Sequence, residues 1–128
     1  MNPVMVFLDA IRDHLDLHEL PPVCSVVVTK WTDPITVQLD TSTLAETARA
    51  LRVWANTLDE VSASLSRMPG GHSVHLRVRG RTPCGIPVEV YGAVPFSEDV
   101  FPDLPAGARQ DMPVFVLRGW ADRGEVAA

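Results

Sequence analysis

A chain of 128 residues, 46% of them hydrophobic and 21% charged, has the size and composition of one soluble globular domain, which excludes a disordered protein. The formal net charge of −5 argues against a dedicated nucleic-acid binder, because such a protein normally carries excess positive charge that neutralises phosphates. Two cysteines, neither of them in a CxxC pair, exclude a disulfide framework, and no apolar run approaches the roughly 20 residues that cross a bilayer.

The N-terminal segment predicts a helix over residues 3–17. Asn2 and Pro3 suit the N-cap and the first helical position, and the apolar residues that follow recur at helical spacing. The segment has no basic start and reaches Asp9 too early for a signal peptide. We therefore expect a cytoplasmic protein. The preference for arginine over lysine is typical of a GC-rich bacterial or phage genome.

The next two segments predict a β-hairpin. Residues 23–31, VCSVVVTKW, are rich in β-branched side chains, and residues 35–40, ITVQLD, alternate apolar with polar. The Thr-Asp-Pro sequence at 32–34 between them is typical of a turn.

A long helix is predicted over residues 43–67. Thr43 and Glu46 fit a capping box, in which the two side chains satisfy backbone donors at the helix start. An apolar stripe follows from Leu44 to Leu65, and Pro69 comes shortly after the predicted end.

A second hairpin is predicted beyond this helix. Residues 74–81 and 86–94 each place aliphatic side chains at even positions, with the turn TPCG at 82–85 between them. In an antiparallel pair, residues that face each other share a side of the sheet, so odd positions oppose odd positions. Arg77 and Arg79 should therefore lie near Glu89 and Tyr91.

The C-terminal part, residues 95–128, differs from the rest of the chain. Several prolines interrupt it, and only residues 113–120, PVFVLRGW, are apolar enough to form a possible fifth strand. That strand would complete the sheet of its own chain or add to the edge of a neighbour.

Together these elements predict an α+β fold, a two-layer sandwich in α-β-β-α-β-β order. Two helices would cover one face of a mainly antiparallel four-stranded sheet, with residues 1–94 as the core and 95–128 as an irregular arm of the same domain. The element order resembles the ferredoxin-like unit with its first strand moved to the end. This resemblance implies the spatial order 3-4-2-1 with antiparallel neighbours. The alternative is 1-2-3-4 with a parallel central pair.

A row of arginines is the candidate functional site. In HLRVRGRT, residues 75–82, basic residues alternate with apolar ones, which places the basic row on the sheet face opposite the helices. Arginine mixed with aromatic side chains is typical of protein interfaces. The predicted interaction face comprises Trp31, Arg77, Arg79, Arg81, Glu89 and Tyr91.

Two other interpretations of this face stay open. It can be a solvated surface whose charges pair with each other, since Glu89 can neutralise an arginine across the hairpin. It can also bind nucleic acid or another anionic ligand through Arg77, Arg79 and Arg81.

The sequence gives little support for metal binding or catalysis. His14 and His18 lie four residues apart, with Cys24 nearby, but a fourth ligand is missing, so we expect no metal. Cys84 is the one nucleophile to consider, and no histidine or acid has an evident reason to lie beside it. We therefore expect no cofactor, and an enzyme without a recognisable motif is the less favoured alternative.

The function predicted from the sequence is that of a small, non-catalytic protein-interaction domain with an accessory or regulatory role. Its partner would be another protein or a second copy of the chain, as in a homodimer that associates through the open sheet face. We expect neither nucleic acid nor a membrane as the partner.

Overall fold

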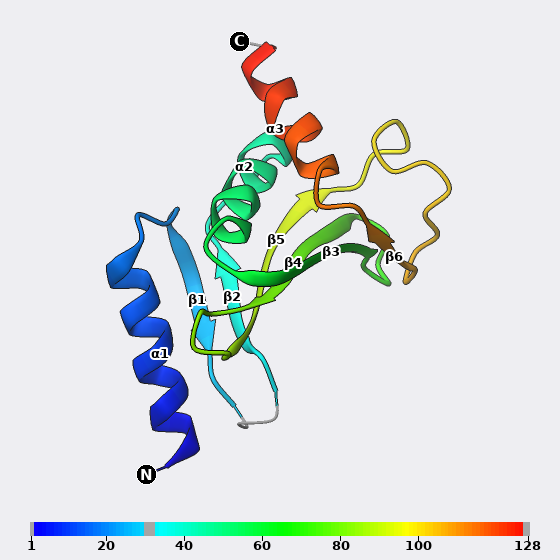
Figure 1. Cartoon of the computed structure of the whole chain (residues 1–128). Coiled ribbons are helices and arrows are strands. Elements are labelled where there is room, and N and C mark those ends of the chain that lie inside the picture. Colours follow the sequence, from blue (N-terminus) through cyan, green and yellow to red (C-terminus); the bar gives the residue numbers. More distant parts are fainter. Residues whose placement is uncertain (1, 30–32, 127–128) are drawn as a thin grey trace.

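The computed structural model describes residues 2–29 and 33–126, with side chains up to residue 123. Within this part of the chain there are three helices and six strands, which confirms an α+β fold (Figure 1). In chain order the elements are α1 (Pro3–Leu17), β1 (Val23–Val27), β2 (Ile35–Leu39), α2 (Leu44–Ala55), β3 (Asp59–Arg67), β4 (Ser73–Arg81), β5 (Pro87–Pro95), β6 (Arg109–Met112) and α3 (Val116–Val126).

The first helix and both hairpins are confirmed. The Asn2 side chain accepts a hydrogen bond of 2.9 Å from the backbone N–H of Val4, which caps α1 as expected. β1 pairs with β2 and β4 pairs with β5, both antiparallel. β1 ends at Val27, earlier than predicted. In the second turn, Gly85 adopts a φ of 91° and donates to the carbonyl of Thr82 over 2.8 Å.

The predicted helix over residues 43–67 is wrong in its second half. Thr43 does cap α2, since its hydroxyl accepts from the backbone N–H of Glu46 over 3.2 Å. The helix ends at Ala55, because the Thr57 hydroxyl donates to the carbonyl of Trp54 over 2.7 Å and competes with further helical bonds. Residues 61–66 read Val-Ser-Ala-Ser-Leu-Ser, and this two-residue alternation forms β3.

The fifth strand expected over residues 113–120 is also wrong. The strand lies just before this segment, as β6, and pairs with β3. From Val116 the chain forms α3, in which Leu117, Trp120 and Ala121 are buried. Their spacing of three and four residues is that of one helix face, and this face packs against α2.

The sheet has six strands instead of four, in the order β1-β2-β5-β4-β3-β6. The four predicted strands are neighbours in the expected order 3-4-2-1, as β4-β5-β2-β1, but the expectation that all of these neighbours are antiparallel is wrong. β2 and β5 are parallel, with Ile35 opposite Val88, and every other neighbouring pair is antiparallel. The additional strand β3 explains the parallel pair. It reverses the chain once more before β5, so that β5 returns in the direction of β2.

The core lies between one face of this sheet and the helices. Gly92 of β5 lies directly beneath α2, because a Cβ atom there would be 2.6 Å from Cγ2 of Thr47. Phe7 and Ile11 of α1 join the same hydrophobic cluster. The hydrophobic side chains with no exposed surface come from β2, β4, β5 and the helices: Ile35, Val37, Val74, Leu76, Val78, Val88, Val90, Ala48, Leu51, Trp54 and Leu117.

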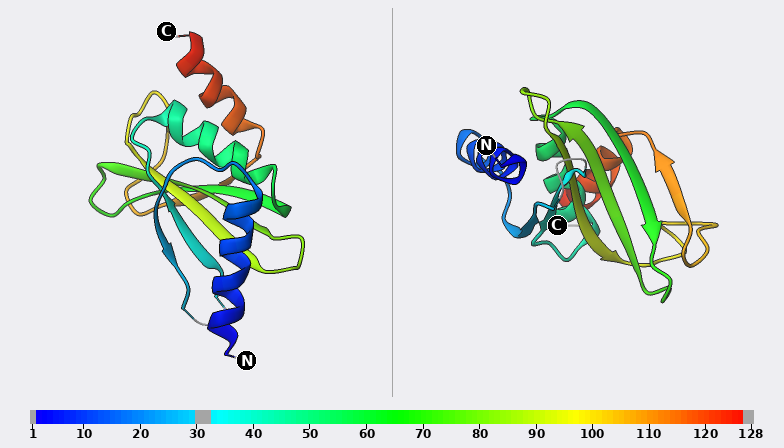
Figure 2. Two further views of the ribbon diagram at one scale, coloured as in Figure 1. Left: turned by 90° about the vertical axis from the view of Figure 1, so that its left-hand side faces the viewer. Right: turned by 90° about the horizontal axis from the view of Figure 1, so that it is seen from below.

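The helices lie on one side of the strands and leave the other side bare (Figure 2, right). α1 stands at the β1 end of the molecule, and β6 forms the opposite end (Figures 1 and 2). No helix in the described residues is long and apolar enough to cross a membrane.

Candidate interaction face

We call the sheet surface opposite the helices the open face. Residues in register share one side of a sheet, and a single row of partners crosses all six strands on this side. In strand order from β1 to β6 the row is Ser25, Gln38, Tyr91, Arg77, Ser64 and Asp111. A neighbouring row, from β1 to β3, is Val27, Thr36, Glu89, Arg79 and Ser62.

Arg77 is the centre of this face. Its Nε lies 3.1 Å from Oε1 of Glu89, and its guanidinium also donates to the hydroxyl of Ser66. The side chains of Arg77 and Glu89 are only 21% and 20% exposed, so this ion pair is less screened than a surface pair. The guanidinium carbon lies 5.9 Å from the ring centroid of Tyr91. Charge pairing and packing therefore hold Arg77 in one orientation.

His75 joins Arg77, Glu89 and Tyr91 in a group that we call the Arg77 cluster. Its ring stacks on Tyr91 with the centroids 5.1 Å apart, and its Nδ1 accepts from the Arg77 guanidinium over 3.4 Å. Burial, and secondly the charge of Arg77, lower the pKa of His75 below its ordinary 6.5. An accepting Nδ1 requires the neutral ring, so the geometry and the pKa agree. The cluster thus carries one neutral aromatic base beside a paired arginine.

The other arginines of the open face differ in how they are paired. Arg81 forms an exposed ion pair with Glu60 over 3.2 Å and donates to the Gly85 carbonyl over 3.0 Å. Arg109 donates to the hydroxyl of Ser64 over 3.3 Å. Arg79 is exposed and forms no ion pair within the described residues. Carboxylates are therefore interspersed with the cations.

The structure brings together five of the six residues predicted for this face. Arg77 and Arg79 lie across the hairpin from Tyr91 and Glu89, as predicted, and the register places Arg77 opposite Tyr91 and Arg79 opposite Glu89. Arg81 extends the row. Trp31 lies outside the described residues. Sequence reasoning missed the serines of β3 and the charged residues of β6, because both segments were assigned to other structures. The alternation of serine with aliphatic residues at 61–66 is the signal that identifies the first group.

The residues considered for metal binding or catalysis are arranged differently. The rings of His14 and His18 have centroids 4.5 Å apart, but Nε2 of His14 lies 2.8 Å from the Thr57 hydroxyl. That hydroxyl already donates to Trp54, so it accepts from His14 and occupies this nitrogen. Among the described residues, no group of three His, Cys, Asp or Glu side chains could hold a metal ion.

Cys84 has closer neighbours than expected. It lines a cavity of about 200 Å³ together with Asp13 and His14, and its Sγ lies 3.2 Å from the hydroxyl of Thr82. A histidine and an acid therefore line the same cavity as Cys84, although no pattern in the sequence indicates this. The Nε2 atom of His14 is engaged with Thr57, so this cavity presents no free base on that nitrogen. Cys24 and Cys84 are both free and exposed.

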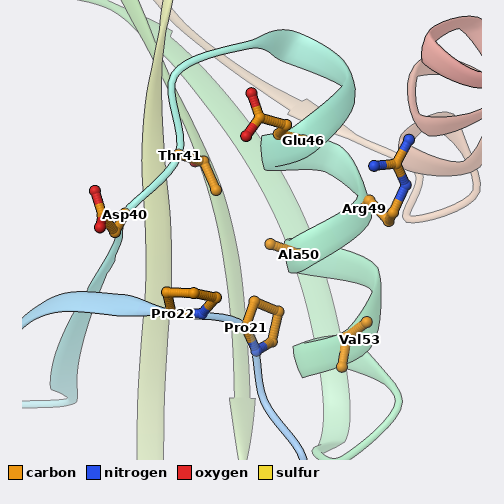
Figure 3. Close-up of a pocket in the computed structure, with 8 residues that line it drawn as sticks. All are labelled: Pro21, Pro22, Asp40, Thr41, Glu46, Arg49, Ala50 and Val53. Atoms are coloured by element: carbon orange, nitrogen blue, oxygen red, sulfur yellow. The ribbon is translucent and has the colours of Figure 1, made fainter. Parts of the chain in front are cut away.

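A further concavity of about 290 Å³ lies where the α1–β1 connection meets α2 (Figure 3). Pro21 and Pro22 face Ala50 and Val53 across it, and the carboxylates of Asp40 and Glu46 stand at its rim. Arg49 points away toward α3, where it donates to the Ala121 carbonyl over 3.5 Å. The pocket is thus apolar with an acidic rim, and it does not join the open face.

Comparison with protein-family models, with curated proteins and with solved structures finds no match for this chain.

Proposed function

We propose that this chain is a small, non-catalytic protein-interaction domain with an accessory or regulatory role, and that the open face is its contact surface. The observation that carries the proposal is the fixed Arg77 cluster. Arginine and tyrosine dominate the energetics of protein interfaces, and a side chain that is already ordered loses less entropy on binding. The Glu89 ion pair and the Tyr91–His75 stack provide this order.

The charges of the open face suggest the chemistry of the partner. Arg79 is exposed and stands beside the ordered cluster, so an acidic side chain of a partner can pair with it without displacing Glu89 from Arg77. On the β3 side the face carries the short side chains of Ser62, Ser64 and Ser66, which allow a flat surface to approach. We therefore expect a partner with a flat, mixed surface that includes at least one carboxylate.

Binding of nucleic acid or another anion through the arginine row is the alternative. Its best location is the hollow of about 230 Å³ that Arg79 and Arg81 line with Ser62. Glu60 lines the same hollow and is paired with Arg81, so a bound phosphate would meet a carboxylate there. This carboxylate and the net charge of −5 favour a protein partner over a polyanion.

Chemical cross-linking in extracts of the cells that encode the chain, followed by mass spectrometry, tests the proposal. We expect cross-linked partner peptides on the open face, lost in Arg79→Glu and retained in Arg118→Glu, which reverses an exposed arginine on α3. A folded Arg79→Glu variant that keeps its cross-links would contradict the proposal. Salt-dependent retention of the wild type on heparin, lost in Arg79→Glu, would favour the anion-binding alternative.

A further inference from the structure

The outer edge of β1 lacks the usual protection of a sheet edge. β1 pairs only with β2, and its sequence, Val-Cys-Ser-Val-Val, contains no charged residue and no proline. Its backbone groups on the outer side form no hydrogen bond with other described residues. Proteins normally protect such an edge with charges, prolines or a covering element, because it can pair with another strand. The features of this kind at β1 are the bulge at Cys24 and Pro22, which directly precedes the strand.

An apolar groove lies directly beside this edge. It has a volume of about 500 Å³ and runs between α1 and β1, where Met5, Leu8, Ile11 and Leu15 face Val26. Met5 is 49% exposed, Leu8 41% and Val26 37%, so α1 has a second apolar stripe besides the one that packs on the core. A strand added to β1 would direct alternate side chains into this groove. Within the described residues, the outer backbone groups of β1 therefore form no hydrogen bond, and the apolar side chains of the groove stay partly exposed.

The charges of the groove indicate which partner fits. Its polar lining is Asp9, Arg12 and Asp16, and Asp9 pairs with Arg12 over 3.1 Å on the exposed side of α1. These two residues lie on either side of the middle of α1. If the α1 helix of a second copy packs antiparallel against this one, with the two helix middles in contact, the Asp9 carboxylate of each copy faces the Arg12 guanidinium of the other. The same operation places Met5 of one copy near Leu15 of the other.

From these observations we infer that the β1 edge and the α1 groove bind a second copy of this chain. A two-fold axis beside β1 would pair the two β1 strands antiparallel and join both sheets into one. The two α1 helices would then cover the junction, with Asp9 of each copy next to Arg12 of the other. Such a contact is isologous, since one surface supplies the strand, the apolar side chains and the complementary charges. This inference does not depend on the open face, which stays free for a different protein.

Sedimentation equilibrium of the purified chain tests the inference. We expect a mass of twice 14.0 kDa for the wild type. Val26→Lys places a charge in the groove and should raise the dimer Kd at least about tenfold. Val27→Lys is the matched control, because Val27 is the next residue of β1 and points to the open face, so its effect should be smaller. Far-UV circular dichroism confirms that each variant is folded.

Charge reversal on α1 tests the same contact without altering the strand. Asp9→Arg alone and Arg12→Asp alone should each weaken the dimer, because like charges then meet across the axis. A mixture of the two variants should restore it, since every contact between chains is again between opposite charges. Rescue by mixing cannot arise from the pair within one helix, because both variants have lost that pair.

Three results would overturn the inference. One is a wild type that stays at 14.0 kDa at concentrations up to about 1 mM. The second is a dimer that neither Val26→Lys nor the α1 charge reversals weaken. The third is a dimer that these variants leave intact but Arg77→Ala disrupts, which would place self-association on the open face. That last result would be consistent with the proposed function, so failure of the two ideas can be told apart.

Discussion

The two ends of the sheet are built in opposite ways. β6 is Arg-Gln-Asp-Met, so its edge carries charges, and Pro113 follows it as Pro22 precedes β1. β1 is uncharged, and beside it α1 keeps an open groove. The chain has protected one edge and left the other accessible, although the two belong to the same sheet. This difference indicates that the β1 end is adapted to contact and the β6 end to stability.

The β6 end is also the better packed of the two. Trp120 of α3 contacts the ring of Phe101 edge to face, with the centroids 5.6 Å apart, and Leu104 is buried nearby. At the β1 end, α1 is attached by one face only, through Phe7, Ile11 and His14. Unequal attachment of this kind predicts different responses to substitution at the two ends.

The largest effect is expected at the β6 end. Trp120→Ala removes a buried indole and leaves a cavity against Phe101, so the free energy of unfolding should fall by about 3–5 kcal/mol. Urea denaturation followed by circular dichroism measures this loss. Phe115→Ala is the control, because Phe115 is 76% exposed and its loss should change stability by about 0.5 kcal/mol or less. Equal effects of the two variants would show that α3 does not pack as described.

A smaller loss is expected for Arg67, which anchors the loop between β5 and β6. Its guanidinium donates to the carbonyl of Leu104 over 2.8 Å and to that of Gly71 over 3.0 Å, and it lies 3.5 Å from the ring centroid of Phe96. Arg67→Met keeps the aliphatic stem and should lower the free energy of unfolding by about 2 kcal/mol. Amide exchange should increase mainly in residues 96–108. Increased exchange in α1 instead would contradict the separation of the two ends.

The smallest effect concerns pH and the β1 end. Burial, and secondly the nearby His18, lower the pKa of His14 below 6.5 in the folded chain. Below about pH 6.5 the unfolded chain therefore binds more protons at this position than the folded chain does. The contribution of neutral His14 to the free energy of unfolding is complete above about pH 6.5 and is lost as the pH falls toward the folded pKa. The urea midpoint of the wild type should drop between about pH 7.5 and pH 5.

His14→Gln keeps an N–H donor for Thr57 and has no charge to gain, so its midpoint should depend less on pH. His75 has a lowered pKa as well, and His75→Gln separates the contribution of the open face from that of α1. If the wild type and His14→Gln respond identically to acid, His14 is not the group that titrates.

Alternation and capping were the reliable signals in the sequence. The second hairpin could be predicted with the faces of its two strands, because a two-residue period assigns each side chain of a strand to one face. The helix predicted over 43–67 is wrong in its second half because Leu58 and Leu65 also fit a helical spacing, which masks the competing two-residue alternation at 61–66. Because of this single error the predicted sheet lacks β3, and the direction predicted for β5 relative to β2 is therefore antiparallel instead of parallel.

The candidate face was predictable only as far as the hairpin reached. Arg77, Arg79, Glu89 and Tyr91 follow from local pairing. Ser64 comes from a strand that was predicted as helix, and Arg109 comes from β6, which joins the sheet through the long connection after β5. The β1 groove was not predictable at all, because Met5 and Leu8 on α1 face Val26 across a distance that no sequence period encodes.

The parallel pairing of β2 with β5 also affects how the chain folds. β3, β4 and β5 form a meander with short-range contacts, but the pair formed by Ile35 and Val88 can close only after the whole segment between them is ordered. Pairing between residues so distant in the chain is slow, so we expect α1 and the first hairpin to dock late, onto a preformed meander. During synthesis, the N-terminal hairpin would leave the ribosome well before its only neighbour in the sheet, and its apolar strand would need to avoid other chains until β5 follows.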